Sequence, residues 1–336
     1  MPLPSVSASP DAAPLQGRHA RWYHARATGT LAGLVILCLV LWIATPHFMT
    51  TTNLVNVVEQ SAIIGVVAVG MTFVILTGGI DLSVGSLIAL SGIVFGLAVQ
   101  GGMSGSIAAI LAMAAGTAAG AVNGLLVTAG RLPPFIATLG MMSVARGIAL
   151  MLSDGRPISG FGDGFRALAT GKLLGIPLPV VVMAAVYAVA HLVLSRTVLG
   201  RYTYAVGGNE EAATLSGVDV RAVKTAIYAI SGLTTAVTSL LLIARLNSAQ
   251  PIAGISYELD AIAAVVIGGA SLLGGAGSVG GTLVGALVMS VLRNGLNLLG
   301  VSSYVQQVAI GIVIVMAVLL DMALRRRTAN TRTRLA

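Results

Sequence analysis

The stretch LVNVVEQSAIIGVVAVGMTFVILT, Leu54 to Thr77, decides the fold class. It contains one charged residue, Glu59, in an otherwise largely apolar run. A helix that crosses the hydrocarbon core of a bilayer needs about 20 mostly apolar residues, so this stretch predicts a transmembrane helix. The whole chain has the same character, since 56% of its 336 residues are hydrophobic and 9% are charged, with a mean hydropathy of +0.95. We therefore expect an all-α polytopic membrane protein.

Apolar runs bounded by glycine, proline or charge predict about ten transmembrane helices. They lie at residues 30–46, 54–77, 82–100, 105–128, 135–152, 174–195, 223–246, 258–274, 278–298 and 303–323. These helices would form one transmembrane domain, residues 30–324. The domain lies between a basic tail of residues 1–29 and a second basic tail of residues 325–336.

The positive charge of the chain predicts its orientation. The formal net charge is +8, and both tails are rich in arginine. Arginine-rich flanks mark the cytoplasmic side of a membrane, so both termini are expected to be cytoplasmic and the number of spans even. An even count places the remaining basic loop residues on the same side: Arg131, Arg196, Arg201, Arg221 and Lys224. The expected location is a membrane, and no nucleic-acid partner is expected.

Motifs for catalysis or nucleotide binding are missing. The chain has one cysteine, Cys38, in an apolar run, and four scattered histidines, so no catalytic constellation and no metal site are predicted. No P-loop motif occurs, because Gly171–Lys172 is followed by Leu173. The sequence GAGSVG at residues 275–280 has dinucleotide-site spacing but joins two apolar helices without a preceding strand. We expect a protein that is not an enzyme and carries no cofactor.

Glycines suggest how the helices pack. Gly116, Gly120 and Gly124 recur every four residues, a spacing that lets two membrane helices approach closely. Two glycine-broken turns, TGGIDLSVGS at residues 77–86 and LGGAGSVGGT at residues 273–282, resemble each other. The similarity indicates either a two-half pseudo-repeat, as found in many transporters, or a chance likeness of glycine-rich segments.

The predicted cytoplasmic loop at about residues 196–222 contains GGNEEAATLSGVDV, Gly207 to Val220. Asn209 suits a helix N-cap and two acidic residues suit the first turn that follows. Gly217 would end the helix. A short cytoplasmic helix of this kind suits insertion into a partner's groove, although an ordinary polar loop remains the alternative. The residues expected to contact this partner are Asn209, Glu210, Glu211, Ala212, Ala213 and Gly217.

The pattern E-A-A-x-x-x-G at Glu211 to Gly217 resembles the coupling loop of permease subunits in binding-protein-dependent ABC importers. With LGRYTYAVGGNEEAATLSGVDV (residues 199–220) and GMTFVILTGGIDLSVGS (residues 70–86), the chain resembles the ribose, xylose and galactoside permease family of bacterial sugar importers. This resemblance implies a permease that imports a monosaccharide, works as a homodimer and takes its cargo from a periplasmic sugar-binding protein. It also implies a separate ABC ATPase subunit, which would hold ATP and Mg. Ribose, xylose and galactose all remain open.

Polar residues inside the predicted spans are expected to face the bundle interior, because they are costly in contact with lipid. The candidates for a gate or translocation path are Glu59, Gln60, Asp81, Asn123 and Arg146. Interhelical hydrogen bonding is the alternative role for each of them. For Asp81, expected near the cytoplasmic face, the alternative is an N-cap of the following helix.

Acids at the start of the predicted 258–274 span have two interpretations. Glu258 and Asp260 would lie at its outer end, where they could dock the binding protein together with Arg245. Alternatively, they only complement the positive end of a helix.

Two other functions compete with the sugar importer. An ion-coupled secondary transporter would use buried carboxylates beside broken helices, and Asp81 and Glu59 are its best support. A permease of the same family could instead carry a cargo other than a sugar. Membrane lipid is an expected partner in every case.

Overall fold

The computed structural model describes the backbone of residues 16–333, and the side chains of residues 29–316, 318 and 319. The chain is mostly helical within this range. The helices are α1 (Gln16–Ala44), α2 (Thr51–Leu76), α3 (Val84–Gln100), α4 (Gly105–Thr128), α5 (Pro134–Leu152), α6 (Asp163–Thr170), α7 (Leu178–Arg196), α8 (Val198–Gly208), α9 (Glu210–Leu215), α10 (Val220–Leu246), α11 (Tyr257–Ile267), α12 (Val279–Leu298) and α13 (Ser303–Thr333). The strands β1 (Ile158–Ser159) and β4 (Ser248–Ala249) pair antiparallel, as do β2 (Lys172–Leu173) and β3 (Ile176–Pro177).

Six of the described helices are long and apolar enough to cross a membrane: α2, α4, α5, α7, α10 and α12. Shorter apolar helical stretches occur at Gly29–Ala44, Val84–Gln100 and Ser303–Met316. The prediction of a helical multi-pass membrane protein is therefore confirmed. Each of the ten predicted ranges overlaps one helix of this structure. The tail residues 1–15 and 334–336 lie outside the described residues.

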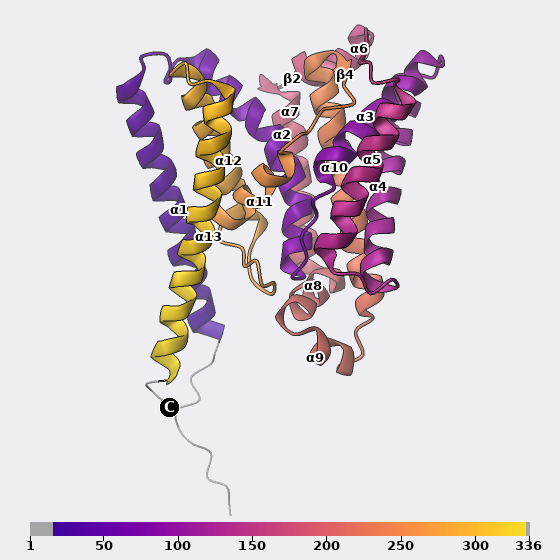
Figure 1. The fold of residues 1–336 in the computed structure, drawn as a ribbon. Helices are drawn as coiled ribbons and strands as arrows, with labels where there is room; N and C mark the ends of the chain where they lie inside the picture. Colours follow the sequence, from indigo (N-terminus) through magenta and orange to yellow (C-terminus); the bar gives the residue numbers. More distant parts are fainter. Residues whose placement is uncertain (1–15, 334–336) are drawn as a thin grey trace, which may run out of the picture.

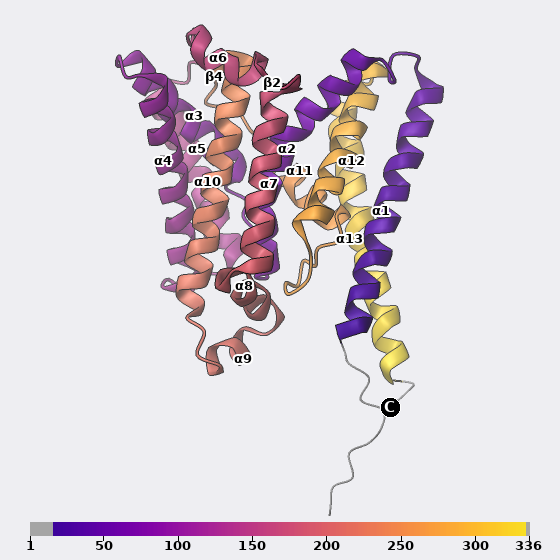
Figure 2. The ribbon, with the colours of Figure 1, turned by 180° about the vertical axis from the view of Figure 1, so that it is seen from behind.

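Helices α2 and α10 are the most buried of the six long apolar helices. Figures 1 and 2 show α1, α12 and α13 together on one side and α3, α4 and α5 on the other. The short helices α8 and α9 lie at one end of the molecule, where α1 begins and α13 ends, and α6 lies at the opposite end (Figure 1). The predicted cytoplasmic loop thus lies at the same end as both terminal helix ends.

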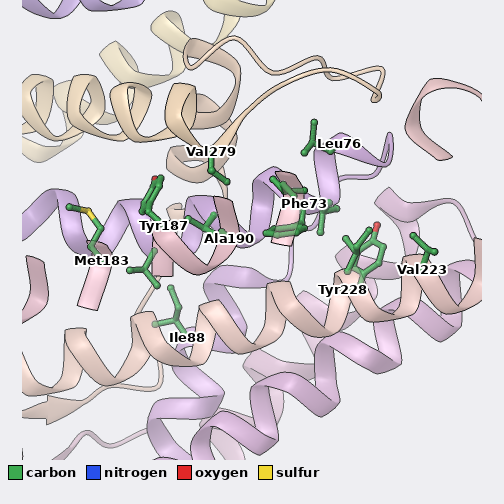
Figure 3. Close-up of a cluster of buried hydrophobic side chains, with 14 of the residues drawn as sticks. Phe73, Leu76, Ile88, Met183, Tyr187, Ala190, Val223, Tyr228 and Val279 are labelled. Carbon is green, nitrogen blue, oxygen red and sulfur yellow. The ribbon is translucent and has the colours of Figure 1, made fainter. Parts of the chain in front are cut away.

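The core forms where apolar residues cover every side of α2. Most of this helix is buried, namely every residue from Ser61 to Leu76, as expected for a helix that is apolar all round. In Figure 3, Phe73 of α2 and Tyr228 of α10 belong to one buried cluster with Tyr187 of α7. The Tyr187 hydroxyl donates to the carbonyl oxygen of Gly65 at 3.2 Å, which satisfies its polar end inside the core.

A seam of small residues joins α4 to α10. A β-carbon added at Gly116 would lie 2.7 Å from the carbonyl oxygen of Gly232, and one added at Gly124 would lie 2.5 Å from the α-carbon of Thr225. One added at Gly120 would collide with the carbonyl oxygen of Tyr228. The close helix approach predicted from the glycine spacing is confirmed.

Two interruptions of helical structure meet inside the molecule. Residues 77–83 separate α2 from α3, and residues 247–256 separate α10 from α11. A β-carbon at Gly254 would lie 2.5 Å from the carbonyl oxygen of Gly85, in the first turn of α3. Gly254 itself has φ +72°, a conformation that favours glycine.

The predicted helix at residues 258–274 is wrong in its length. The helix α11 ends at Ile267, and residues 268–278 form an irregular loop. Four glycines of that loop, Gly269, Gly274, Gly275 and Gly277, have positive φ, which ends helical structure. With its 11 residues, α11 is too short to cross the hydrocarbon core alone.

Candidate functional site

The short helix α9 is confirmed together with its cap. The Asn209 side chain accepts a hydrogen bond from the backbone N–H of Ala212 at 2.9 Å, and Glu210 and Glu211 occupy the first turn. Gly217 has φ +83°, and the backbone N–H of Val218 donates to the carbonyl oxygen of Ala213 at 3.1 Å, so the helix is closed at its end. These local interactions agree with the helix bounds expected from the sequence.

Most of α9 faces away from the rest of the chain. Ala213 is the one buried residue in the helix, whereas Glu210, Glu211 and Ala212 are exposed. Leu215 is 84% exposed, an apolar side chain at the tip of the helix that the sequence analysis did not single out. A capped helix with an uncovered mixed surface is suited to fit a partner's groove.

Polar and backbone contacts attach the helices α8 and α9 to the membrane-spanning helices. Lys224 of α10 lies with its Nζ 2.6 Å from Oε2 of Glu210. Gly207 of α8 packs directly against the carbonyl oxygen of Leu76, the last residue of α2. The backbone N–H of Gly275 donates to that same carbonyl at 2.9 Å. A β-carbon added at Gly274 would lie 2.8 Å from the backbone nitrogen of Gly78, so the two glycine-broken turns noted in the sequence meet beside α8.

Asp81 lies fully buried in the segment between α2 and α3. Its Oδ1 accepts from the backbone N–H of Ser83 at 3.0 Å and from the Ser83 hydroxyl at 2.6 Å. Its Oδ2 accepts from the Ser231 hydroxyl of α10 at 2.8 Å. Asn123 of α4 extends the network, because its Nδ2 donates to the Ser83 hydroxyl at 2.8 Å.

This network differs from a simple N-cap at Asp81. The N-cap position of α3 is Ser83, and Asp81 precedes it by two residues. Among the described side chains, no lysine or arginine pairs with Asp81, so its oxygens depend on hydroxyl and backbone donors. Asp81 and Asn123 are thereby brought together, and they connect α3, α4 and α10.

Two side chains of α5, about two helical turns apart, donate hydrogen bonds to the backbone of residues 77–83 and 247–256. The Thr138 hydroxyl donates to the carbonyl oxygen of Ile80 at 3.2 Å. The Nη1 of Arg146 donates to the carbonyl oxygens of Pro251 and Ala253 at 2.7 and 2.8 Å. Backbone groups that leave a helix inside a membrane need such partners, because no water is available in the bilayer core. Arg146 thus has a defined structural role.

The remaining candidates lie apart from this network. Glu59 and Gln60 are half-buried near the start of α2. Glu59 lines a small hollow with Ala169, Pro179 and Arg245, among others. The structure therefore does not gather all five path candidates into one site.

Asp260 does not lie at an outward-facing helix end, and the prediction that it would is wrong. Its side chain is 1% exposed, and both of its oxygens accept from Nη2 of Arg293 at 2.7 and 2.6 Å. The helix begins in the interior because residues 247–256 enter the bundle before it. Arg293 was missed, although a charged residue within a predicted span signals a buried partner.

Comparison with known proteins identifies the family. A family model described as the permease component of the branched-chain amino acid transport system matches residues 53–318. The chain belongs to this permease family. It is a multi-pass protein of the bacterial inner (plasma) membrane.

Several curated relatives cover most of this permease. It is 50% identical to the ribose import permease protein RbsC of Bacillus subtilis over 87% of this chain and 92% of that protein. It is 48% identical to RbsC of Escherichia coli K12, with the same two coverages. The D-allose transport system permease protein AlsC of Escherichia coli K12 is 38% identical over 87% of this chain and 90% of that protein. No solved structure matches the permease.

Proposed function

We propose that this chain is the membrane permease subunit of an ABC importer that moves a monosaccharide from a periplasmic binding protein into the cytoplasm. The exposed, capped helix α9 carries the proposal, because it offers a separate ATPase a surface that the rest of the chain leaves uncovered. Relatives named for ribose and allose transport support a sugar cargo, and ribose is the first to test.

In this proposal the chain crosses the membrane ten times, and α11 makes one of these crossings together with the irregular segments on either side of it. Both termini lie in the cytoplasm, on the side of α8 and α9. Two copies flank a central path, and two ATPase subunits bind ATP and Mg. The closing of the ATPases moves α9, and α10 passes the motion to the buried network at Asp81. The path then opens outward to accept the sugar, and hydrolysis returns it to the inward-facing state.

The alternative of an ion-coupled secondary transporter lacks support beyond its two carboxylates. Glu59 and Asp81 do not share a site in the structure, and the relatives named above are import permeases. A family member with a cargo other than a sugar remains an outcome of the uptake test.

The first experiment is a pull-down of the tagged full-length chain from detergent-solubilised native membranes, followed by mass spectrometry. We expect a P-loop ATPase to be recovered with the wild type and lost with Glu211→Arg. Asp163→Arg, a charge reversal on α6 at the opposite end, should retain the ATPase. Recovery of the ATPase with Glu211→Arg at the wild-type level would contradict the role of α9.

The second experiment identifies the cargo and the number of permease copies. Cells that express the complete importer should take up labelled ribose in preference to allose, xylose, galactose and leucine. Cross-linking in membranes should give a dimer of this chain. Preferred uptake of leucine would indicate that the cargo is an amino acid. Uptake that persists without the ATPase would support the secondary-transporter function instead.

A further inference from the structure

A basic hollow lies where α4 ends and α10 begins, beside α9. Its volume is about 360 Å³, and it is lined by Val127, Thr128, Arg131, Glu210, Val220, Arg221 and Lys224. We name it the α4–α10 hollow. It shares no residue with the Asp81 network, and it occurs at the end of the molecule that carries α8 and α9.

The charges around the α4–α10 hollow favour an anion. Three cationic side chains face one carboxylate, and Lys224 is already paired with Glu210. Within the described side chains, Arg131 and Arg221 take part in no ion pair. Two guanidinium groups in one hollow suit a phosphate, which arginine binds with two parallel hydrogen bonds.

The helix ends beside the hollow act in opposite directions. The N-terminus of α10 favours an anion, although Asp219 already caps it by accepting from the N–H of Ala222 at 3.0 Å. The C-terminal carbonyls of α4 disfavour an anion. The two effects offset each other, so the attraction rests on the two arginines.

Exposed apolar side chains neighbour the lining residues of the hollow along the chain. Leu125 on the last turns of α4, Leu132 in the loop that follows and Phe135 at the start of α5 are all exposed. In a chain that spans the membrane, such side chains face acyl chains at the boundary of the bilayer. A free anion or an acidic peptide would use the arginines alone, whereas a phospholipid would use the arginines and this apolar surface together.

We propose that the α4–α10 hollow binds the headgroup phosphate of an anionic phospholipid of the cytoplasmic leaflet. The phosphate contacts Arg131 and Arg221, and the acyl chains lie along Leu125 and Leu132. Lys224 borders the same hollow, so the bound lipid lies next to the ion pair that joins α10 to α9. An effect of the lipid on transport would rest on the proposed function, but binding itself does not.

The test uses the purified full-length chain and native mass spectrometry, with phosphatidylglycerol and phosphatidylcholine offered in equal amounts. The wild type should retain phosphatidylglycerol selectively. Arg131→Gln combined with Arg221→Gln should reduce this retention about tenfold or more, since each basic residue near the surface adds to the attraction. The matched control, Arg196→Gln with Arg201→Gln, removes two exposed arginines at the same end and should change retention less than about twofold.

Four outcomes would overturn the proposal. Equal losses in the two double variants would indicate diffuse attraction to basic surface. Equal retention of both lipids would remove the anionic preference. Displacement of the lipid by millimolar inorganic phosphate would indicate a site for a free anion, and displacement by the purified ATPase would indicate a protein interface. Thermal unfolding of both variants checks that each is folded, and the result stands whether or not Glu211→Arg disrupts the ATPase complex.

Discussion

Lys224 and Glu210 form an ion pair that joins the second turn of α10 to the first residue of α9, with 2.6 Å between Nζ and Oε2. The lysine side chain is 12% exposed and the glutamate side chain 54%. A pair this open to water contributes about 1 kcal/mol or less to stability. Its importance therefore lies in the position it gives to α9, which otherwise buries only Ala213.

Charge reversal should separate this positional role from stability. Glu210→Lys or Lys224→Glu alone should lower sugar uptake about fivefold, because α9 loses the ion pair that positions it. A fivefold change corresponds to about 1 kcal/mol. The double variant should recover most of the uptake, because it restores the pair with opposite polarity. Uptake in membrane vesicles with the purified ATPase checks this. Single variants with full uptake would show that α9 is held by other contacts.

Adjacent glycines at the end of α8 should respond differently to alanine. A β-carbon at Gly207 would collide with the carbonyl oxygen of Leu76 and lie 2.5 Å from the backbone nitrogen of Gly275. At Gly208, no atom lies within 4 Å of the added carbon. Gly207→Ala should therefore destabilise the protein by about 1–3 kcal/mol, as overpacking does, and Gly208→Ala should be nearly neutral. Thermal unfolding in detergent measures both, and equal Tm values would contradict the packing of α8 against α2.

Asp81→Asn should impair folding or gating more than sugar preference. The variant keeps one acceptor oxygen but replaces the other with a donor, which disturbs the bonds from Ser83 or Ser231. The expected loss is about 1–3 kcal/mol for a buried group left without its partner. Thermal unfolding and competition between labelled and unlabelled sugars test this, with exposed Asp163→Asn as the control. A changed sugar preference with an unchanged Tm would place Asp81 in the path.

The pair of Asp260 and Arg293 should be costly to break. Asp260→Ala leaves the arginine unpaired, and the expected loss is about 3 kcal/mol, near the lower end of the range for buried pairs. The lower end applies because the Arg293 side chain is 30% exposed and retains some contact with solvent. Replacing both residues, with Asp260→Leu and Arg293→Met, should recover part of the loss. A double variant less stable than Asp260→Ala, measured by thermal unfolding, would show that each residue acts separately.

Local signals in the sequence were sufficient for some elements and not for others. The cap at Asn209, the acids after it and Gly217 all act within one short helix, so α9 was predictable with its ends. The entry of residues 247–256 into the bundle depends instead on Arg146, about 100 residues earlier in the chain. The burial of Asp260 likewise depends on Arg293, and hydrophobic periodicity contains no record of such pairs. The ends of α11 were therefore beyond prediction, although Pro251 and Gly254 mark a break.

The glycine seam between α4 and α10 determines how these two helices can move. Backbone touches backbone at Gly120 and Gly232, so neither helix has flexible side chains over which the other could slide. Lys224 lies at the end of α10 near α9, and Ser231 lies farther along the same helix, where its hydroxyl donates to Asp81. In the proposed importer, we expect a push on α9 to tilt α4 and α10 together, and the break between α2 and α3 to move in response.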